Sequence, residues 1–141
     1  MKILVPVDGS AGADQAVDHV LGMARLLKEP PQVLLLNVQW NIASGNVKLF
    51  INQETINDYY REQGMAALAS ARKKLDAAGL PYTYHVSIGT PAEAIVQYAK
   101  EQRVDLIAMG AQGQGGLSSL LLGSVVNKVA HLAVMPVLLV K

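Results

Sequence analysis

Apolar positions along the chain form short continuous runs, separated by longer segments with helical spacing. The short runs predict strands at residues 3–7, 33–38, 82–88, 104–109 and 137–140. The longer segments repeat apolar residues three and four positions apart and predict helices that begin after Ser10, near Glu54, after Thr90 and after Gly123. Residues 40–52 show no clean period and are expected to be a connection. Strands and helices therefore alternate along the chain.

Local signals mark several ends of these elements. Ser10 is expected to cap the first helix, and Asp14 in its first turn suits the positive end of the helix dipole. The pair Asp8-Gly9 often marks a hairpin, but the helical spacing after it predicts a strand-to-helix turn. Gly79 is a good residue to follow the second helix. The segment Thr90–Glu93 predicts a capping box, with a proline at the first helical position.

This order of elements predicts a single α/β domain over residues 1–141. Short, wholly apolar strands are typical of a parallel sheet with helices on both faces. Right-handed crossovers then give an open, doubly wound sheet of five strands. If strands 3–7 and 104–109 are neighbours, the loops after them face one crevice, where open α/β sheets bind ligands. Spacing alone does not fix that strand order.

The glycine-rich stretch from Leu106 to Lys128 is the strongest functional signal, and reads LIAMGAQGQGGLSSLLLGSVVNK. Glycine lets a backbone approach a ligand closely, and a helix N-terminus offers unpaired N–H groups to an anion. The stretch carries no charge before Lys128, so a phosphate would be held by N–H groups and by the hydroxyls of Ser118, Ser119 or Ser124. The Gly-Lys-Ser/Thr of a Walker A loop is missing, which argues against ordinary P-loop NTPase chemistry. The alternative is a loop that only caps a helix.

Composition narrows the function classes. A chain of 141 residues with 51% hydrophobic and 16% charged residues is globular. The net charge is +1 with no Lys/Arg stripe, so neither nucleic acid nor a membrane surface is an expected partner. There is no cysteine, and the three histidines lack ligand spacing, so no metal cluster is assigned. The first apolar run is too short for a signal sequence and no 18-residue apolar stretch exists, so we expect a cytoplasmic protein without membrane insertion.

Three motifs resemble the universal stress protein family, over essentially the whole length of the chain. The opening ILVPVDGS is similar to the family's first strand and turn, and VMPVLLV to its last strand. The family's ATP-binding branch carries Gly-x2-Gly-x9-Gly-Ser/Thr, matched here by Gly110, Gly113, Gly123 and Ser124. The resemblance implies the strand order 3-2-1-4-5, with the first and fourth strands adjacent. It also implies a homodimer through the last strand.

The resemblance implies three groups of ligand-binding residues. The adenine and ribose end would be lined by Pro6, Val7 and Asp8, with Val38 packing on the adenine. The nucleoside would lie along Met109 and Gly110. The phosphates would be held, through backbone N–H groups and one hydroxyl, by Gly113, Gly123, Ser124 and Val125. Many relatives carry a basic residue near Gln112 or Gln114; its loss here makes a divalent cation such as Mg²⁺ more important for binding a triphosphate.

Three functions remain open from the sequence. The first is a homodimeric ATP-binding sensor or regulator in the stress response, whose regulatory protein partner is unidentified. The second is a slow ATPase or phosphotransferase, for which Asp8 is the only candidate base; no catalytic residue is assigned. The third is an interaction protein that ignores nucleotide. Trp40 is interpreted as a loop anchor, and Tyr59 and Tyr60 as packing residues.

Overall fold

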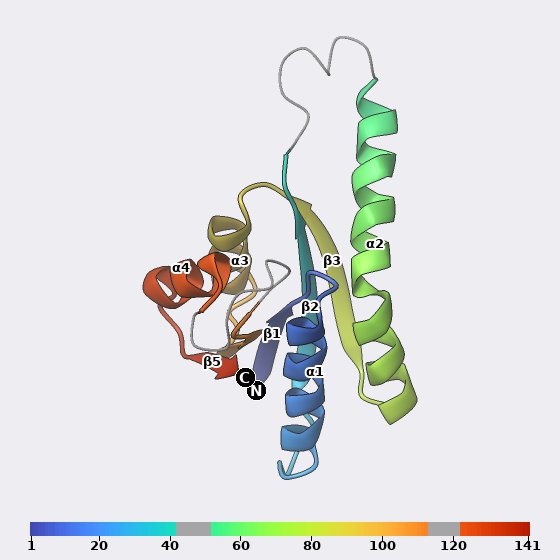
Figure 1. The fold of residues 1–141 in the computed structure, drawn as a ribbon. Coiled ribbons are helices and arrows are strands. Elements are labelled where there is room, and N and C mark those ends of the chain that lie inside the picture. The colour runs from blue at the N-terminus through green and yellow to red at the C-terminus, as the bar shows by residue number, and fades with distance from the viewer. Residues whose placement is uncertain (42–51, 113–121) are drawn as a thin grey trace.

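The structure is a computed structural model that describes residues 1–41, 52–112 and 122–141. Five strands and four helices alternate through these residues (Figure 1). The strands are β1 (Lys2–Pro6), β2 (Gln32–Gln39), β3 (Tyr82–Ile88), β4 (Leu106–Gly110) and β5 (Val137–Val140). The helices are α1 (Ala11–Ala24), α2 (Gln53–Ala78), α3 (Pro91–Glu101) and α4 (Ser124–Leu132). The alternation predicted from the sequence is confirmed, with strand ends displaced by one or two residues.

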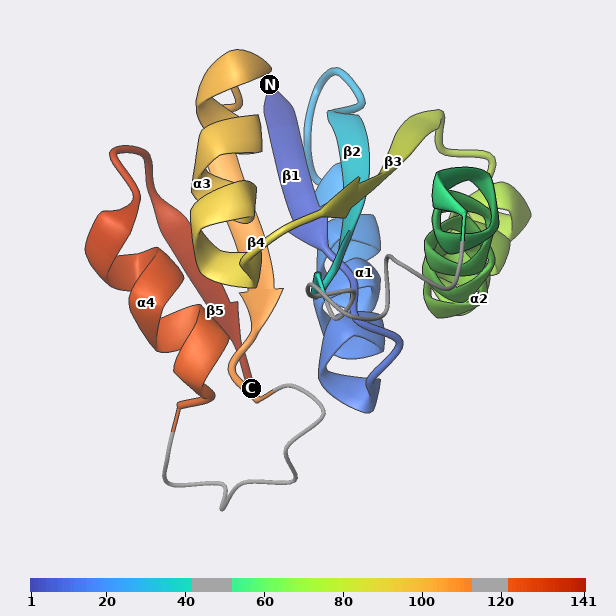
Figure 2. The same ribbon diagram turned by 90° about the horizontal axis from the view of Figure 1, so that it is seen from above.

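The strands form one parallel sheet in the order β3-β2-β1-β4-β5. This confirms both the doubly wound fold and the adjacency of β1 and β4. Viewed along the sheet, α1 and α2 cover one face and α3 and α4 the other (Figure 2). The chain therefore leaves β1 and β4 toward opposite faces, and the carboxyl ends of these two neighbours form the switch point of the sheet.

Alternate residues of each strand supply the two apolar layers of the core. In β1, Ile3 and Val5 pack toward α1 and α2, whereas Leu4 packs toward α3 and α4. All three side chains are fully buried. A central parallel strand must be apolar on both faces, which explains the continuous run in the sequence. No helix in the described ranges is long and apolar enough to cross a membrane.

The predicted capping box at the start of α3 is wrong. Thr90 is the N-cap residue, but its side chain accepts no hydrogen bond from the first turn. Glu93 instead forms an ion pair with Lys128 of α4, and this pairing lowers the pKa of the Glu93 carboxyl. The carboxylate that a capping box would turn toward Thr90 is thus paired with the Lys128 ammonium. The predicted cap of α1 does form, as does the glycine end of α2, where Gly79 has a φ of 67°.

Candidate functional site

A cavity of about 720 Å³ opens at the switch point, beside the carboxyl ends of β1, β2 and β4. Its volume lies within the range of about 300–1,000 Å³ that is usual for small-molecule sites. The walls come from the loop after β1, the first turns of α1 and α4, the start of α3 and one side of α2. Segments far apart in the sequence therefore meet around one space.

The structure brings the site residues predicted from the sequence to this cavity. Those in the described part of the chain all line it: Pro6, Val7, Asp8, Val38, Met109, Gly110, Gly123, Ser124 and Val125. Gly113 lies outside the described residues. The strand order explains this convergence, because β2, β1 and β4 are consecutive neighbours whose carboxyl ends share one edge of the sheet.

The loop after β1 satisfies the start of α1 internally. An Asp8 carboxylate oxygen accepts a hydrogen bond from the Ser10 N–H at 3.0 Å, in the manner of an Asx turn. Gly9 between them has a φ of 84°, which favours glycine. The Ser10 hydroxyl then accepts a hydrogen bond from the Ala13 N–H at 3.2 Å. Side chains of the loop itself therefore accept hydrogen bonds from the N–H groups at the start of α1.

The first turn of α4 is built without such a side chain. Its N-cap residue is Gly123, which has no side chain to accept a hydrogen bond, and no side-chain cap is present in the described structure. The Gly123 N–H donates to the Ala111 carbonyl at 2.9 Å, and the Ala111 N–H donates to the Val140 carbonyl at 2.8 Å. The start of α4 is thus fixed to β4 and β5, while its first turn, with the exposed Ser124, lines the cavity. An N-terminus held this way can donate N–H groups to an anion.

Gly110 has a packing role that the motif did not reveal. A Cβ atom there would clash with the backbone of Gly12, approaching its Cα atom to 2.8 Å. A Cβ atom at Gly12 would in turn collide with the carbonyl oxygen of Gln112. Both glycines are therefore required for α1 to lie against the end of β4. This close approach brings the loop after β1 beside the segment that follows β4.

Two walls and one support of the cavity were not predicted from the sequence, and one of these walls is Pro91 and Ile95 of α3. The α2 residues that line it are Tyr59, Tyr60, Gln63, Ala66 and Ala67. Asn37 of β2 is 3% exposed, and its side-chain amide donates to the Val7 carbonyl at 2.8 Å while accepting from the Gln39 amide at 2.7 Å. An asparagine inside the apolar run of β2 was the available signal for such a support. Trp40, interpreted as a loop anchor, is 59% exposed and also lines the cavity.

The cavity walls carry little formal charge. Asp8 is the only ionised side chain among the described lining residues, and they include no histidine, lysine or arginine. No group of three or more acidic or histidine side chains that could hold a metal ion occurs in the described residues. An anionic ligand would therefore meet backbone dipoles and hydroxyl groups instead of a fixed cation.

An open parallel α/β sheet with a ligand-sized cavity at its switch point defines the class of the protein. The model of the universal stress protein family matches residues 1–141, and the chain belongs to that family. Universal stress protein MJ0531 of Methanocaldococcus jannaschii is 33% identical, over 99% of this chain and 81% of that protein.

Two solved structures support the fold assignment. The structure of MJ0577 from the same organism has a TM-score of 0.81 and 32% identity, covering 99% of this chain and 94% of that one. An Arabidopsis thaliana family protein solved with AMP bound has a TM-score of 0.71 and 21% identity, covering 100% and 91%. At that identity the second similarity concerns the fold alone.

Proposed function

We propose that this protein is a cytoplasmic, homodimeric regulator that binds ATP in the switch-point cavity. The observation that carries the proposal is the start of α4. Its N-cap is Gly123, no side chain caps it in the described structure, and its first turn lines a cavity of about 720 Å³. Gly110, Gly123 and Ser124 also stand at the spacing of the family's ATP-binding branch.

The two ends of the cavity suit the two ends of a nucleotide. Val38, Trp40 and Tyr59 offer apolar and aromatic surface for a base. The first turn of α4 offers N–H groups and the Ser124 hydroxyl for phosphate oxygens. Asp8 lies at the end of β1, where its carboxylate can accept a hydrogen bond from a ribose hydroxyl. The AMP-bound relative from Arabidopsis is consistent with an adenine nucleotide.

Mg²⁺ would enter with the nucleotide. The described lining residues supply one carboxylate, Asp8, and no preformed metal cluster. Mg²⁺ is commonly held by one or two carboxylates together with substrate phosphates, so this donor set fits such an ion. The residue that would face it at the phosphate end is Ser124, and Asp8 would face it in place of the ribose hydroxyl. Its role would be to neutralise phosphate charge that no lysine or arginine of the described lining meets.

The charged groups of the cavity lining favour a regulator over an enzyme. Phosphoryl transfer depends on cationic groups that stabilise developing charge, and an arginine finger contributes about 10³–10⁵ in rate. The described lining supplies no such group and no histidine base. We therefore expect bound ATP to be hydrolysed very slowly, if at all. Nucleotide would act by shifting the population of conformations that a protein partner recognises.

The dimer would form through β5. This strand lies at one edge of the sheet, and its four residues Val137–Val140 are apolar and half-buried. An exposed apolar edge strand invites pairing with another chain, and two-fold pairing would be isologous. Light scattering of the wild-type protein should report a dimer, and Leu138→Lys should weaken it. A monomer at tens of micromolar wild-type protein would remove the dimer from the proposal.

Mass spectrometry of the ligand released from purified protein tests the nucleotide assignment. The proposal expects ATP. A predominance of ADP would favour the slow ATPase, and turnover that collapses in Asp8→Ala at unchanged affinity would make Asp8 its catalytic residue. An empty protein that also fails to bind added Mg-ATP would favour the nucleotide-independent interaction protein. Denaturation with acid at once after purification keeps released ATP from being hydrolysed before detection.

A further inference from the structure

The second feature that suggests binding is the free edge of the sheet at β3. Among the described strands, β3 has one neighbour only, β2, with an unbroken register from Tyr82 to Ile88. The Gly89 N–H donates to the Gln39 carbonyl at 2.9 Å, so residue 89 faces β2. Backbone groups alternate in direction along a strand. The N–H and C=O groups of Tyr84 and Val86 therefore point away from the sheet.

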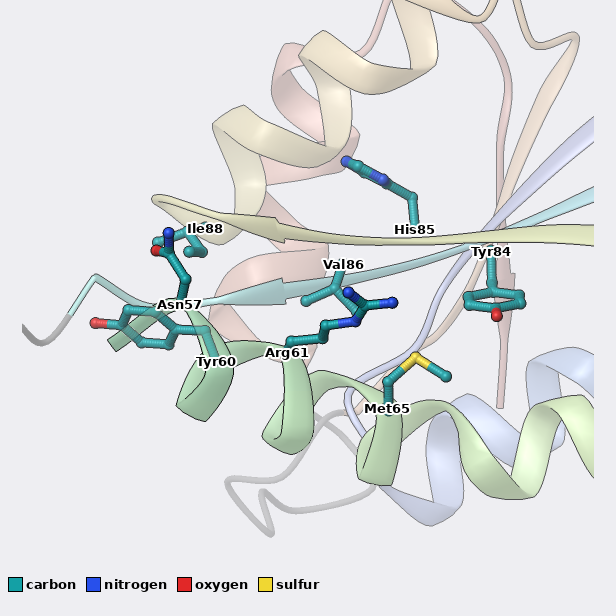
Figure 3. Close-up of a pocket in the computed structure, with 8 residues that line it drawn as sticks. All are labelled: Asn57, Tyr60, Arg61, Met65, Tyr84, His85, Val86 and Ile88. Carbon is teal, nitrogen blue, oxygen red and sulfur yellow. The ribbon is translucent and has the colours of Figure 1, made fainter. Parts of the chain in front are cut away.

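A groove runs along this edge between β3 and α2. It encloses a cavity of about 320 Å³, and its lining includes Arg61 and Met65 from α2 and Tyr84, Val86 and Ile88 from β3. Figure 3 shows Tyr84 and Val86 on the α2 side of the strand and His85 on the opposite side. Tyr84 is 45% exposed and Ile88 43%, so the groove is open to a partner. Both outward-facing backbone positions thus lie beside an apolar and aromatic surface.

The permanent charge on the lining of the groove is positive. Arg61 is the only lining side chain with a permanent charge, and it forms no ion pair within the described residues. Further along α2, the Arg72 guanidinium lies 4.2 Å from the centre of the Tyr84 ring, and its Nε donates to the Tyr82 hydroxyl at 3.4 Å. Asp76 is near enough to act on the charge of Arg72, but they too form no ion pair in the described structure.

We propose that the edge of β3 binds an extended, acidic segment of a partner protein by strand addition. The segment would pair its backbone with Tyr84 and Val86. A rise of about 1.5 Å per helical residue puts the Cα atoms of Arg61 and Arg72 roughly 16 Å apart, which about five strand residues span. Acidic side chains on the face of the segment toward α2 can therefore reach both guanidinium groups, and apolar side chains alternate with them on the opposite face.

The same charges disfavour a second copy of this chain as the occupant. Pairing of β3 with β3 of another copy would bring two sets of Arg61 and Arg72 to one interface, where like charges repel. The positive edge thus discourages self-association while leaving strand addition open to acidic segments. The groove adjoins the switch-point cavity, because Tyr60 lines both, but its test uses protein without nucleotide, so its failure would leave the nucleotide proposal standing.

Fluorescence anisotropy with a labelled, capped peptide of alternating valine and glutamate tests the charge requirement. We expect saturable binding at low salt, and none for a matched valine–lysine peptide. Arg61→Glu should weaken binding by about tenfold or more, since a charge-assisted hydrogen bond is replaced by repulsion. Lys73→Glu is the matched control: it makes the same charge change on an exposed position of α2 outside the groove lining. Circular dichroism checks that both variants fold.

Amide hydrogen exchange by NMR tests the strand addition itself. The Tyr84 and Val86 amides should exchange fast in free protein and slow markedly with peptide. The His85 and Ser87 amides face β2 and should be protected in both states. No binding, equal weakening in Arg61→Glu and Lys73→Glu, or binding without protection at Tyr84 and Val86 would overturn the proposal. So would protection that rises with protein concentration alone, since a second copy would then cover the edge.

Discussion

The helices α1 and α4 both begin at the cavity, but their first turns are built differently. Ser10 caps α1 by accepting from the Ala13 N–H at 3.2 Å, whereas α4 begins at Gly123 and receives no side-chain cap from the described residues. α1 also packs so closely on the end of β4 that a Cβ atom at Gly110 would clash with the Gly12 backbone. One N-terminus is thus capped by its own side chains, and the other is the one that we propose donates N–H groups to a ligand. The position of a helix at a switch point does not by itself decide whether it binds an anion.

The largest expected effect comes from giving α4 an anionic cap of its own. Gly123→Asp places a carboxylate where a phosphate would bind, so Mg-ATP should no longer stabilise the protein. In wild-type protein that stabilisation should be about 2.7 kcal/mol at a ligand concentration a hundredfold above Kd. The measurement is a thermal melt with and without Mg-ATP.

Gly22→Asp is the control for Gly123→Asp. It adds the same charge to α1 at a position where a Cβ atom meets nothing within 4 Å, and it should keep the full ATP shift. An ATP shift that survives in Gly123→Asp would show that the first turn of α4 is not the phosphate site.

The next effect concerns the packed N-terminus of α1. Gly12→Ala should destabilise the fold by about 1–3 kcal/mol, because the added Cβ collides with the Gln112 carbonyl and the helix must shift. Gly22→Ala makes the same substitution in the same helix where space is open, and should stabilise the fold by about 0.5–1 kcal/mol. Urea unfolding measures both free energies. Equal changes in the two variants would contradict the close packing of α1 on β4.

Two serine substitutions should distinguish the two helices, because one should lower the stability of the fold and the other the affinity for ATP. Ser10→Ala should cost about 1 kcal/mol of unfolding free energy, the usual worth of an N-cap, with ATP affinity nearly unchanged. Ser124→Ala should leave stability unchanged and weaken ATP binding by about tenfold, through loss of one hydrogen bond to a charged group. Calorimetric titration and urea unfolding of both proteins provide the comparison. Loss of affinity in Ser10→Ala alone would reverse the assignment of the two helices.

The smallest expected effect concerns the ion pair that joins α4 to α3. Lys128 lowers the pKa of Glu93, so the pair stabilises the fold at neutral pH and loses its effect as pH falls through the lowered pKa of Glu93. Lys128→Met should raise that pKa and change stability only slightly, since both side chains are about half exposed. NMR titration of the Glu93 carboxyl group measures this pKa. An unchanged pKa would show that the pair does not persist in solution.

The sequence predicted the elements well because each depends on local pattern. β1 and α1 were predicted from an apolar run and from helical spacing after Ser10. The glycine spacing between residues 110 and 125 predicted that the start of α4 belongs to the site. The α2 wall was missed because Tyr59 and Gln63 reach the cavity only through the packing of α2 on the sheet. Gly12 belongs to no recognisable motif, because the need for glycine there comes from close contact with Gln112, a hundred residues away. The capping box at Thr90 was wrong: the Thr90 side chain accepts no bond from the first turn, and Glu93 pairs with Lys128, which is distant in sequence.

The most direct test is an NMR titration of the wild-type protein with Mg-ATP, following backbone amides at the two N-termini. The amides of Ser124 and Val125 should shift strongly and saturably, because they would donate to phosphate oxygens. The Ala13 amide, already bonded to the Ser10 hydroxyl, should shift little. No saturable shift at Ser124 and Val125, or a larger one at Ala13, would contradict the assignment of α4 as the phosphate-binding helix.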